Sequence, residues 1–450
     1  MLTINDISLT IADKQILKNI TYNLTSGVVG LVGANGAGKT TLFKIIMKQL
    51  KPDSGTISAP HELIGYLPQE LRADKLSGGE RTKNHILQLI RSVPKPTILL
   101  LDEPTNNLDL NAVRWLEGLI RTFPGPVLLS SHDRQFLDDT VDSIIELDNG
   151  ELKQYGGNYS FYKEQKGVEK EAYERKYLAQ QKTIHDVEDN ITAIKGKAYK
   201  GEETFSSRNP YQRRKIKKSA HQGVVRQRKL EKFLASEERL DKPVHRKDYP
   251  FRFEGDTHSR KFILSFNSVS KSYDRPVLTN VSGIISGKEH IWLSGPNGSG
   301  KTTLLKIAAG LMLPDRGTIE KGTGVRIGYF SQEMELPQPG QTAIDILQKL
   351  GATSTEVFRY GAFMALTKED LTQPVSALSR GQHTKLAFIR LLMGNNQLLI
   401  LDEPTNHLEM ETREKIEEAL QGFQGAILVA SHDRYFLEKI GVSKEFKMPE

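Results

Sequence analysis

Two loops with the same spacing of glycine, lysine and threonine occur in the chain, GANGAGKT at Gly33–Thr40 and GPNGSGKT at Gly295–Thr302. Each follows an apolar run and precedes a stretch of helix formers, which is the setting that a phosphate-binding loop requires. Backbone N–H groups of the glycines can surround phosphates, and the N-terminus of the following helix adds a positive dipole. We expect each lysine to reach the β- and γ-phosphates and the next threonine to ligate Mg²⁺. The residues predicted to bind ATP are Gly33, Asn35, Gly36, Gly38, Lys39, Thr40 and Thr41 in the first loop, and Gly295, Asn297, Gly298, Gly300, Lys301, Thr302 and Thr303 in the second.

A carboxylate pair ends an apolar run in each half of the chain, in LLLDEP at Leu99–Pro104 and in LLILDEP at Leu398–Pro404. An aspartate at the edge of a sheet can hold Mg²⁺, and the glutamate after it can orient or deprotonate an attacking water. A plain turn is the alternative interpretation, but the apolar run and its repetition argue against it. The candidate Mg²⁺ ligands are therefore Thr40, Asp102, Thr302 and Asp402, and the candidate catalytic residues are Glu103 and Glu403.

The doubled motif set divides the chain into two similar halves. Residues 1–157 and residues 261–450 both begin with short apolar strands and then alternate strands, helices and glycine-rich turns. This order of elements is typical of an α/β fold with a largely parallel sheet. The sequence therefore predicts two P-loop ATPase domains, each of which positions one phosphate loop and one carboxylate pair.

Residues 158–260, between the halves, have the composition of a two-helix hairpin. Residues 159–194 contain few helix breakers and mixed charge, which predicts one long helix. Glycines and a proline are expected to end it and to place the tip at about residues 196–216. A second helix is predicted for about residues 213–239. The middle segment is thus expected to be an interdomain linker, an αα-hairpin with a polar tip that carries aromatic residues.

The positive charge of the chain is concentrated in this linker. The protein has a formal net charge of +7, and Lys195–Lys232 alone contains 13 Lys and Arg against 3 Asp and Glu. Bases stack on aromatic rings and phosphates pair with Lys and Arg, so this segment suits a nucleic acid. A solvated basic surface or a rigid spacer is the alternative interpretation. The candidate RNA-binding residues are Lys197, Tyr199, Lys200, Phe205, Arg208, Tyr211, Arg213, Arg214, Lys215, Lys217 and Lys218.

The composition excludes several other classes of protein. The chain has no cysteine, which rules out disulfides, thiolate zinc sites and iron–sulfur clusters and fits a reducing compartment. No apolar run approaches the roughly 18 residues that span a bilayer. The N-terminus also lacks the basic and then apolar order of a signal peptide. We therefore expect a cytoplasmic protein with no membrane partner.

Further motifs make both halves resemble the ATP-binding cassette (ABC) superfamily. They are the signature loops LSGGE at Leu76–Glu80 and LSRGQ at Leu378–Gln382, together with a Q-loop glutamine and an SHDR histidine in each half. The resemblance implies that the two cassettes of one monomer close head to tail, so that each ATP lies between one phosphate loop and the other cassette's signature serine. The site residues that it implies are Gln69 and Gln332 as Mg²⁺ ligands, His132 and His432 as catalytic residues, and Ser77, Gly78, Gly79, Ser379 and Gly381 as ATP contacts.

Within the superfamily, the chain resembles the ABC-F branch of tandem cassettes joined by a charged two-helix linker. The wording DEPTNNLD and DEPTNHLE and the segment GGNYSFYKEQK carry this resemblance. It implies an ATP hydrolase that binds the 70S ribosome at the tRNA exit site, contacts rRNA and tRNA, and points its linker tip toward the peptidyl-transferase centre. Antibiotic target protection is the favoured role, and a housekeeping translation factor is the alternative.

Another alternative is the ATPase component of a transporter with a separate membrane subunit. It leaves the basic hairpin unexplained. A DNA-repair ABC ATPase would carry zinc cysteines or very long coiled coils, so no DNA partner is expected.

The first cassette departs from the family pattern in the length of one connection. Gln69 and Ser77 are 8 positions apart, whereas Gln332 and Ser379 are 47 positions apart. The first cassette therefore has little room for the helical subdomain that is usual there.

The two ATP sites also differ in their predicted contacts. The resemblance to ABC proteins implies that Tyr273 stacks on adenine, and the internal alignment puts Ile11 at the matching position of the first cassette. Arg380 replaces a signature glycine, and Glu409 replaces an aspartate after the carboxylate strand. All of these losses fall on the site of Lys39, so the site of Lys301 is predicted to turn over faster.

Overall fold

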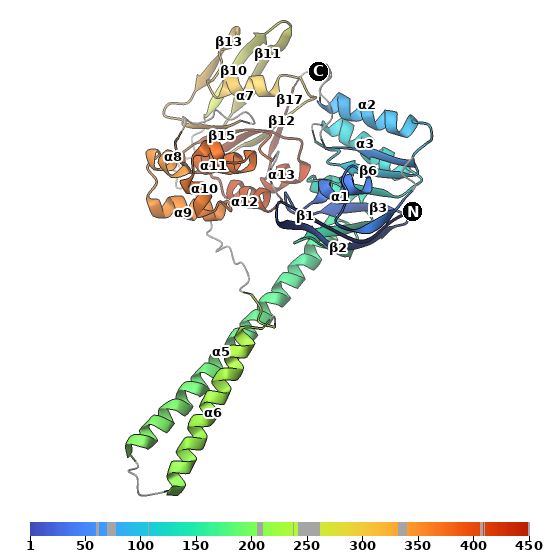
Figure 1. The fold of residues 1–450 in the computed structure, drawn as a ribbon. Coiled ribbons are helices and arrows are strands. Elements are labelled where there is room, and N and C mark those ends of the chain that lie inside the picture. Colours follow the sequence, from blue (N-terminus) through green and yellow to red (C-terminus); the bar gives the residue numbers. More distant parts are fainter. Residues whose placement is uncertain are drawn as a thin grey trace. The chain divides into compact units, whose positions relative to one another are not determined.

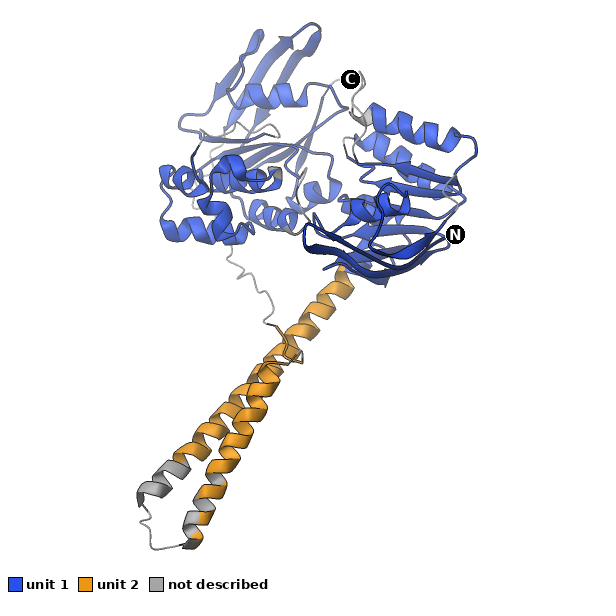
Figure 2. Ribbon diagram, in the orientation of Figure 1, with its two compact units in different colours: residues 1–162, 247–450 blue, residues 163–246 orange. Residues whose placement is uncertain are grey.

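A computed structural model describes residues 1–59, 63–69, 78–106, 108–204, 210–236, 238–241, 262–331, 340–405, 408 and 410–448. The chain forms two compact units, which Figure 2 shows in two colours. Met1–Tyr162 and Lys247–Glu450 make up the first unit, and Lys163–Arg246 makes up the second. The second unit lies inside the predicted linker of residues 158–260.

The first cassette contains two sheets (Figure 1). An antiparallel sheet has the order β2-β1-β4, with β1 at Leu2–Ile11, β2 at Lys14–Leu24 and β4 at Ser54–Ser58. A second sheet has the order β5-β6-β7-β3-β8-β9 and is parallel except for its last pair. Its strands are β3 (Val28–Val32), β5 (Ile64–Leu67), β6 (Ile98–Asp102), β7 (Val127–Ser130), β8 (Ser143–Asp148) and β9 (Glu151–Gly156).

The central strands of this sheet are apolar because both of their faces are covered. Every residue of β6 is buried. Leu100 packs on the side of the antiparallel sheet, whereas Leu99 and Leu101 pack on the opposite side. Helix α1 (Lys39–Ile46) belongs to the first side, and α2 (Gly78–Arg91), α3 (Leu110–Thr122) and α4 (Arg134–Thr140) belong to the second. This layering fixes the end of β6, where the carboxylate pair lies.

The second cassette repeats this plan. Its antiparallel sheet has the order β11-β10-β13, and its parallel sheet has the order β14-β15-β16-β12-β17. The strands are β10 (Leu264–Ser272), β11 (Pro276–Ile285), β12 (His290–Ser294), β13 (Arg316–Lys321), β14 (Ile327–Phe330), β15 (Leu398–Asp402), β16 (Ala426–Ala430) and β17 (Lys444–Lys447). The helices that match α1, α2, α3 and α4 are α7 (Lys301–Ala308), α11 (Arg380–Met393), α12 (Met410–Gln421) and α13 (Arg434–Lys439).

A helical insertion is present in the second cassette between β14 and α11. It contains α8 (Ala343–Lys349), α9 (Ser354–Phe363) and α10 (Lys368–Thr372), each of which starts with a threonine capping box. These caps satisfy N–H groups at the start of each short helix. In the first cassette only residues 68–77 connect β5 to α2. That connection is too short for an equivalent three-helix insertion.

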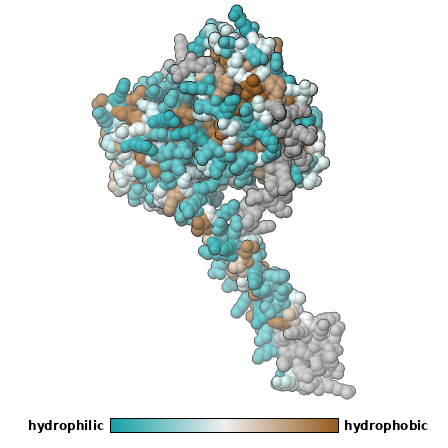
Figure 3. Space-filling model, turned by 180° about the vertical axis from the view of Figure 1, so that it is seen from behind, coloured by the Kyte–Doolittle hydropathy of each residue, from teal (hydrophilic) through white to brown (hydrophobic). Residues whose placement is uncertain are grey.

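The second unit is built from two helices, of which α5 spans Tyr159–Thr204 and α6 spans Pro210–Leu234. Lys195 Nζ on α5 donates to Gln227 Oε1 on α6. Farther along α5 from the tip, Tyr173 Oη donates to the carbonyl of Asp241, and Gln180 Nε2 donates to that of Glu238, both in the segment that follows α6. In Figure 3 the surface of this unit that is not grey is mainly hydrophilic. Among the described helices of the whole chain, none has the length and apolar character to cross a membrane.

The expected interruption of the long helix was wrong. Helix α5 continues through Gly196 and Gly201 and so enters the predicted tip of residues 196–216. One glycine destabilises a helix by only about 1 kcal/mol relative to alanine. The Lys, Ala and Glu residues around both glycines favour the helix and outweigh that penalty. Helix α6 starts at Pro210, since proline is tolerated in the first turn where its missing N–H is not needed.

Candidate active site

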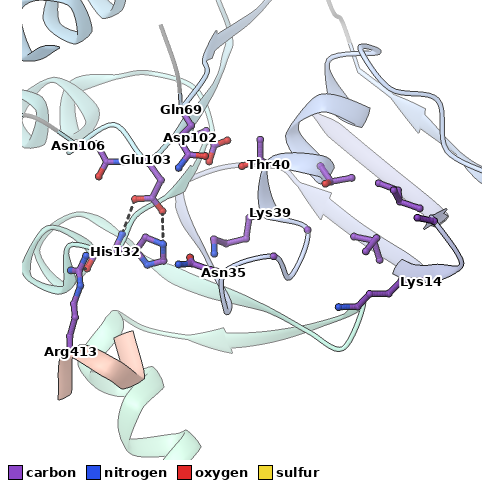
Figure 4. Close-up of a pocket in the computed structure, with 16 residues that line it drawn as sticks. Lys14, Asn35, Lys39, Thr40, Gln69, Asp102, Glu103, Asn106, His132 and Arg413 are labelled. Atoms are coloured by element: carbon purple, nitrogen blue, oxygen red, sulfur yellow. Dashed lines mark hydrogen bonds and ion pairs between the residues drawn. The ribbon is translucent and has the colours of Figure 1, made fainter. Parts of the chain in front are cut away.

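A cavity of about 630 Å³ lies in the first cassette, a volume typical of small-molecule sites. It combines the loop after β3, the end of β6 and the edge of the antiparallel sheet. Figure 4 shows its lining side chains. The lining residues are Ile11, Ala12, Lys14, Ile16, Asn35, Gly36, Gly38, Lys39, Thr40, Thr41, Gln69, Asp102, Glu103, Asn106, His132 and Arg413. Most of the residues that the sequence predicts for the first phosphate loop and the carboxylate pair after β6 are thus brought together, with Arg413 of the second cassette added.

Glycine is required in the loop that leads into α1. Gly38 precedes the helix with φ at 107°, and a Cβ there would lie 2.8 Å from Ile16 Cγ2. Gly36 also has a positive φ, but the space beside it is open. Lys39 Nζ donates to the carbonyls of Gly33 at 2.7 Å and Ala34 at 3.2 Å. The loop therefore presents backbone N–H groups and an ammonium to the same cavity, as phosphate binding needs.

Oxygen-bearing side chains line this cavity beside the loop. Thr40, Gln69 and Asp102 come from α1, the residues after β5, and the end of β6. Hard cations such as Mg²⁺ prefer such oxygen ligands, so these residues fit the ion. Ser130 Oγ donates to Asp102 Oδ1 at 2.7 Å and accepts from the N–H of Glu103 at 3.1 Å. Ser130 is not among the residues predicted from the sequence, although it is the first serine of the SSHDR segment.

Glu103 lies at the end of β6 and contacts the loop before α4. Its backbone is left-handed, with φ at 51°, which is strained for a residue with a side chain. The N–H of His132 donates to Oε2 at 3.1 Å, and His132 Nε2 lies 3.3 Å from Oε1, as the dashed lines of Figure 4 show. These contacts aim the carboxylate into the cavity.

Burial shifts the pKa values of Glu103 and His132 in opposite directions. It raises the pKa of Glu103 to about 7, with Lys39 acting against the shift and Asp102 adding to it. A carboxylate with a pKa near 7 is well matched to proton transfer at neutral pH. Burial also lowers the pKa of His132 to about 3, and the positive charges of Lys39 and Arg413 act in the same direction. The ring is therefore neutral, and Nε2–H can donate to Glu103.

The second cassette has the same constellation. Lys301 Nζ donates to the carbonyls of Gly295 at 2.8 Å and Pro296 at 3.0 Å. Glu403 has φ at 47°, and burial raises its pKa to about 8, with Asp402 acting in the same direction. His432 Nε2 lies 3.5 Å from Glu403 Oε1. Burial lowers the pKa of His432 to about 4, so this ring is neutral as well. Both halves thus place a strained glutamate, buried in the first cassette and partly buried in the second, against a neutral histidine.

The two sites differ in several described residues. Ala430 pairs with Asp402 across the strands where Ser130 pairs with Asp102, so the second site lacks that hydroxyl. Ile11 lines the first cavity and is 46% exposed, and Tyr273 is 56% exposed. Each cassette therefore has one of these exposed side chains, Ile11 in the first and Tyr273 in the second, against which a nucleotide base could pack.

The Ile11→Tyr substitution is expected to tighten ATP binding at the Lys39 site about fivefold. An added ring that stacks on a base contributes on the order of 1 kcal/mol. The measurement is titration with a fluorescent methylanthraniloyl-ATP in a Lys301→Ala background, which isolates the first site. The matched control is Tyr273→Ile in a Lys39→Ala background, which should weaken binding by a similar factor. An unchanged affinity in both variants would contradict stacking at these positions.

Several predicted residues lie away from the cavity or outside the described part of the chain. Ser379 caps α11, where its Oγ accepts from the N–H of Gln382 at 3.3 Å, and Gly381 is in the first turn of that helix. Neither of them lines the cavity of Lys39. Gly78 and Gly79 begin α2. Ser77, Gln332, Glu409, Phe205 and Arg208 lie outside the described residues.

The remaining candidate RNA-binding residues lie on the two helices of the second unit. Near the end of α5 are Lys197, Tyr199 and Lys200. In the first turns of α6 are Tyr211, Arg213, Arg214, Lys215, Lys217 and Lys218. The side chain of Tyr211 is exposed.

The two cassettes meet through reciprocal ion pairs. Arg134 Nη1 lies 3.0 Å from Glu417 Oε2, and both side chains are buried. Arg434 Nη2 lies 2.7 Å from Glu117 Oε1. The two pairs are equivalent with the cassettes exchanged. In each pair, one cassette supplies the arginine that follows its SHD segment, and the other supplies a glutamate from α3 or α12. This self-complementary pattern is typical of a two-fold interface.

Comparisons with known proteins agree with this architecture. The ABC transporter family profile matches residues 17–75 and 278–406, and a second ABC transporter profile matches residues 145–253. The ribosome protection protein VmlR of Bacillus subtilis is 31% identical over 480 residues, which cover 99% of this chain and 86% of that protein. The chain belongs to the ABC-F family. ABC transporter F family member 2 of Arabidopsis thaliana is 29% identical to this ABC-F protein, over 94% of this chain and 73% of the relative.

Solved structures show the same fold. The archaeal ribosome recycling factor aABCE1, in complex with the ribosomal stalk protein aP1, aligns with a TM-score of 0.61 at 20% identity. The alignment covers 97% of this chain and 86% of that chain. The predicted fold of two ABC cassettes is therefore confirmed. The ABC-F protein is an ATP hydrolase, as its cassettes indicate.

Unequal turnover is expected from the differences between the two sites of this ABC-F ATPase. The Glu103→Gln variant should retain more ATPase activity than Glu403→Gln, because it leaves the Lys301 site with its tyrosine and its intact signature. Phosphate release at saturating ATP measures the two residual rates. Equal residual rates would contradict the prediction.

Proposed function

We propose that this ABC-F ATPase binds the 70S ribosome in its ATP state at the tRNA exit site and protects it from antibiotics. The observation that carries this proposal is the 31% identity to a ribosome protection protein over 99% of the chain. The basic two-helix unit supports it, because polyanions such as rRNA and tRNA attract concentrated Lys and Arg. In this proposal the tip of the hairpin points toward the peptidyl-transferase centre, where it shifts RNA and lowers drug occupancy.

The proposed chemistry assigns a role to each group of site residues. Thr40, Gln69 and Asp102 would hold Mg²⁺ in the first site, and Thr302, Gln332 and Asp402 would hold it in the second. The ion would supply charge neutralisation at the β- and γ-phosphate oxygens. Glu103 and Glu403 orient and deprotonate water, and the two histidines hold these glutamates. Ser379 and Ser77 complete the sites of Lys39 and Lys301 when the cassettes close, so that ATP joins the cassettes and hydrolysis releases them.

Two experiments test the proposal, one for protection from antibiotics and one for ribosome binding. Expression of the protein should raise the inhibitory concentration of at least one class of ribosome-targeting drug, compared with cells that lack the gene. The Glu103→Gln/Glu403→Gln variant should co-sediment with 70S ribosomes when ATP is present and should not when ADP is present. Co-sedimentation without any change in drug sensitivity would indicate a housekeeping translation factor. Loss of both results would refute ribosome binding.

A further inference from the structure

The feature that separates the two ATP sites most clearly is an arginine from the opposite cassette. Helices α3 and α12 are equivalent, and they place Val113 and Arg413 at matching positions. Val113 is buried in the core of its own cassette. Arg413 is buried too, yet it lines the cavity that contains Lys39 and Glu103 (Figure 4).

Hydrogen bonds tie Arg413 to the backbone of both cassettes. Its Nη1 donates to the carbonyl of His132 at 2.7 Å, and its Nε donates to the carbonyl of Leu408 at 3.1 Å. The planar guanidinium can make both bonds at once, which a lysine ammonium on its flexible stem cannot reproduce. His132 in turn holds Glu103 through its N–H and its ring. A continuous path therefore leads from α12 of the second cassette to the carboxylate of the first site.

We propose that Arg413 is a positioning residue for the Lys39 site, which it completes by fixing His132 only while the two cassettes are docked. Because the matching position holds Val113, the Lys301 site has no such link through α3. Hydrolysis at the Lys39 site thereby depends on the docking of α12 in addition to the signature serine. The docking of α3 adds no such condition to the Lys301 site. The two sites then respond differently to the same interface.

A purely structural role for Arg413 is the competing explanation. Asp433 Oδ2 lies 3.6 Å from Nη1, and the charges of Asp133, Arg134 and Glu103 also act on this guanidinium. An arginine that only balanced Asp133 and Asp433 would stabilise the interface for both sites alike. The two explanations therefore differ in whether the loss of Arg413 affects one site or both.

The test uses the full chain in two single-site backgrounds. In Glu403→Gln, where only the Lys39 site hydrolyses, Arg413→Gln should lower kcat for ATP at least about tenfold and leave KM within threefold, since a misplacement of about 1 Å can cost 10²-fold. In Glu103→Gln, the same substitution should change kcat by less than twofold. Arg413→Lys keeps the charge near Asp433 and should recover only part of kcat, and it also serves if Arg413→Gln does not fold.

Hydrogen exchange without nucleotide gives a second readout. Peptides around His132 should exchange faster in Arg413→Gln, whereas peptides around His432 should not. The matched control is Arg434→Gln, which breaks the pair with Glu117 but removes no atom that lines the cavity, and it should affect both backgrounds alike. Equal losses of kcat in the two backgrounds, or unchanged exchange at His132, would overturn the proposal.

Discussion

The Glu103→Gln/Glu403→Gln variant is expected to hydrolyse ATP at least about 100-fold more slowly than the wild type while it still binds ATP. A positioned general base contributes about 10² to 10⁴ in rate, and each glutamine keeps the shape of the side chain but cannot take a proton. Phosphate release measures the rate, and titration with methylanthraniloyl-ATP measures binding.

The same variant should fold normally. Burial already raises the pKa of Glu103 to about 7 and that of Glu403 to about 8, so a neutral side chain is well accommodated at both positions. Glu438→Gln is the matched control, because that side chain is exposed on α13, and it should leave the rate unchanged. A double variant that kept more than a tenth of the wild-type rate would show that the base lies elsewhere.

The Glu417→Leu substitution is expected to lower the melting temperature by about 10 °C. It removes the ion-pair partner of Arg134. The Met410 carbonyl at 3.4 Å and the Tyr435 ring at 4.8 Å remain beside this guanidinium, but neither carries a charge. Leaving one charge of a buried pair alone destabilises by about 3–5 kcal/mol. In a domain of this size, 1 kcal/mol corresponds to about 2–4 °C. Thermal melting of the intact chain measures the shift.

Two further variants separate a lost pair from a damaged helix. Glu418→Gln, exposed on the same helix, should move the melting temperature by no more than about 2 °C. Arg134→Met/Glu417→Leu should recover most of the loss, since no buried charge remains. If the double substitution melted as low as Glu417→Leu alone, the unpaired charge would not be the cause.

Local sequence patterns predicted the parts of this protein that depend on nearby residues. Lys39 and Thr40 of the predicted phosphate loop line one cavity together with Asp102 and Glu103, because a strand, a tight turn and a helix follow directly from one another. The predicted shortage of space after Gln69 also agrees with the short connection before α2. The roles of these residues in binding and catalysis stay predictions.

Features that depend on distant parts of the chain could not be predicted in this way. The contact of Arg413 with His132 joins residues 281 positions apart, and nothing beside either residue indicates it. An alignment of the two halves pairs Arg413 with Val113, but it does not show that the Arg413 side chain contacts His132 of the other cassette. The end of α5 differs from the prediction for a different reason. The helix formers around Gly196 and Gly201 stabilise the helix by more than these two glycines destabilise it.

The reciprocal pairs Arg134–Glu417 and Arg434–Glu117 have a consequence for how such a chain can evolve. In a dimer of identical subunits, a single mutation alters both copies of a two-fold interface at once. A tandem gene encodes the two copies separately, so one can change while the other is kept. An arginine could therefore arise in α12, at the position equivalent to Val113, without a second arginine at the other ATP site. In this way a symmetric ancestor could become an ATPase whose two sites hydrolyse ATP under different conditions.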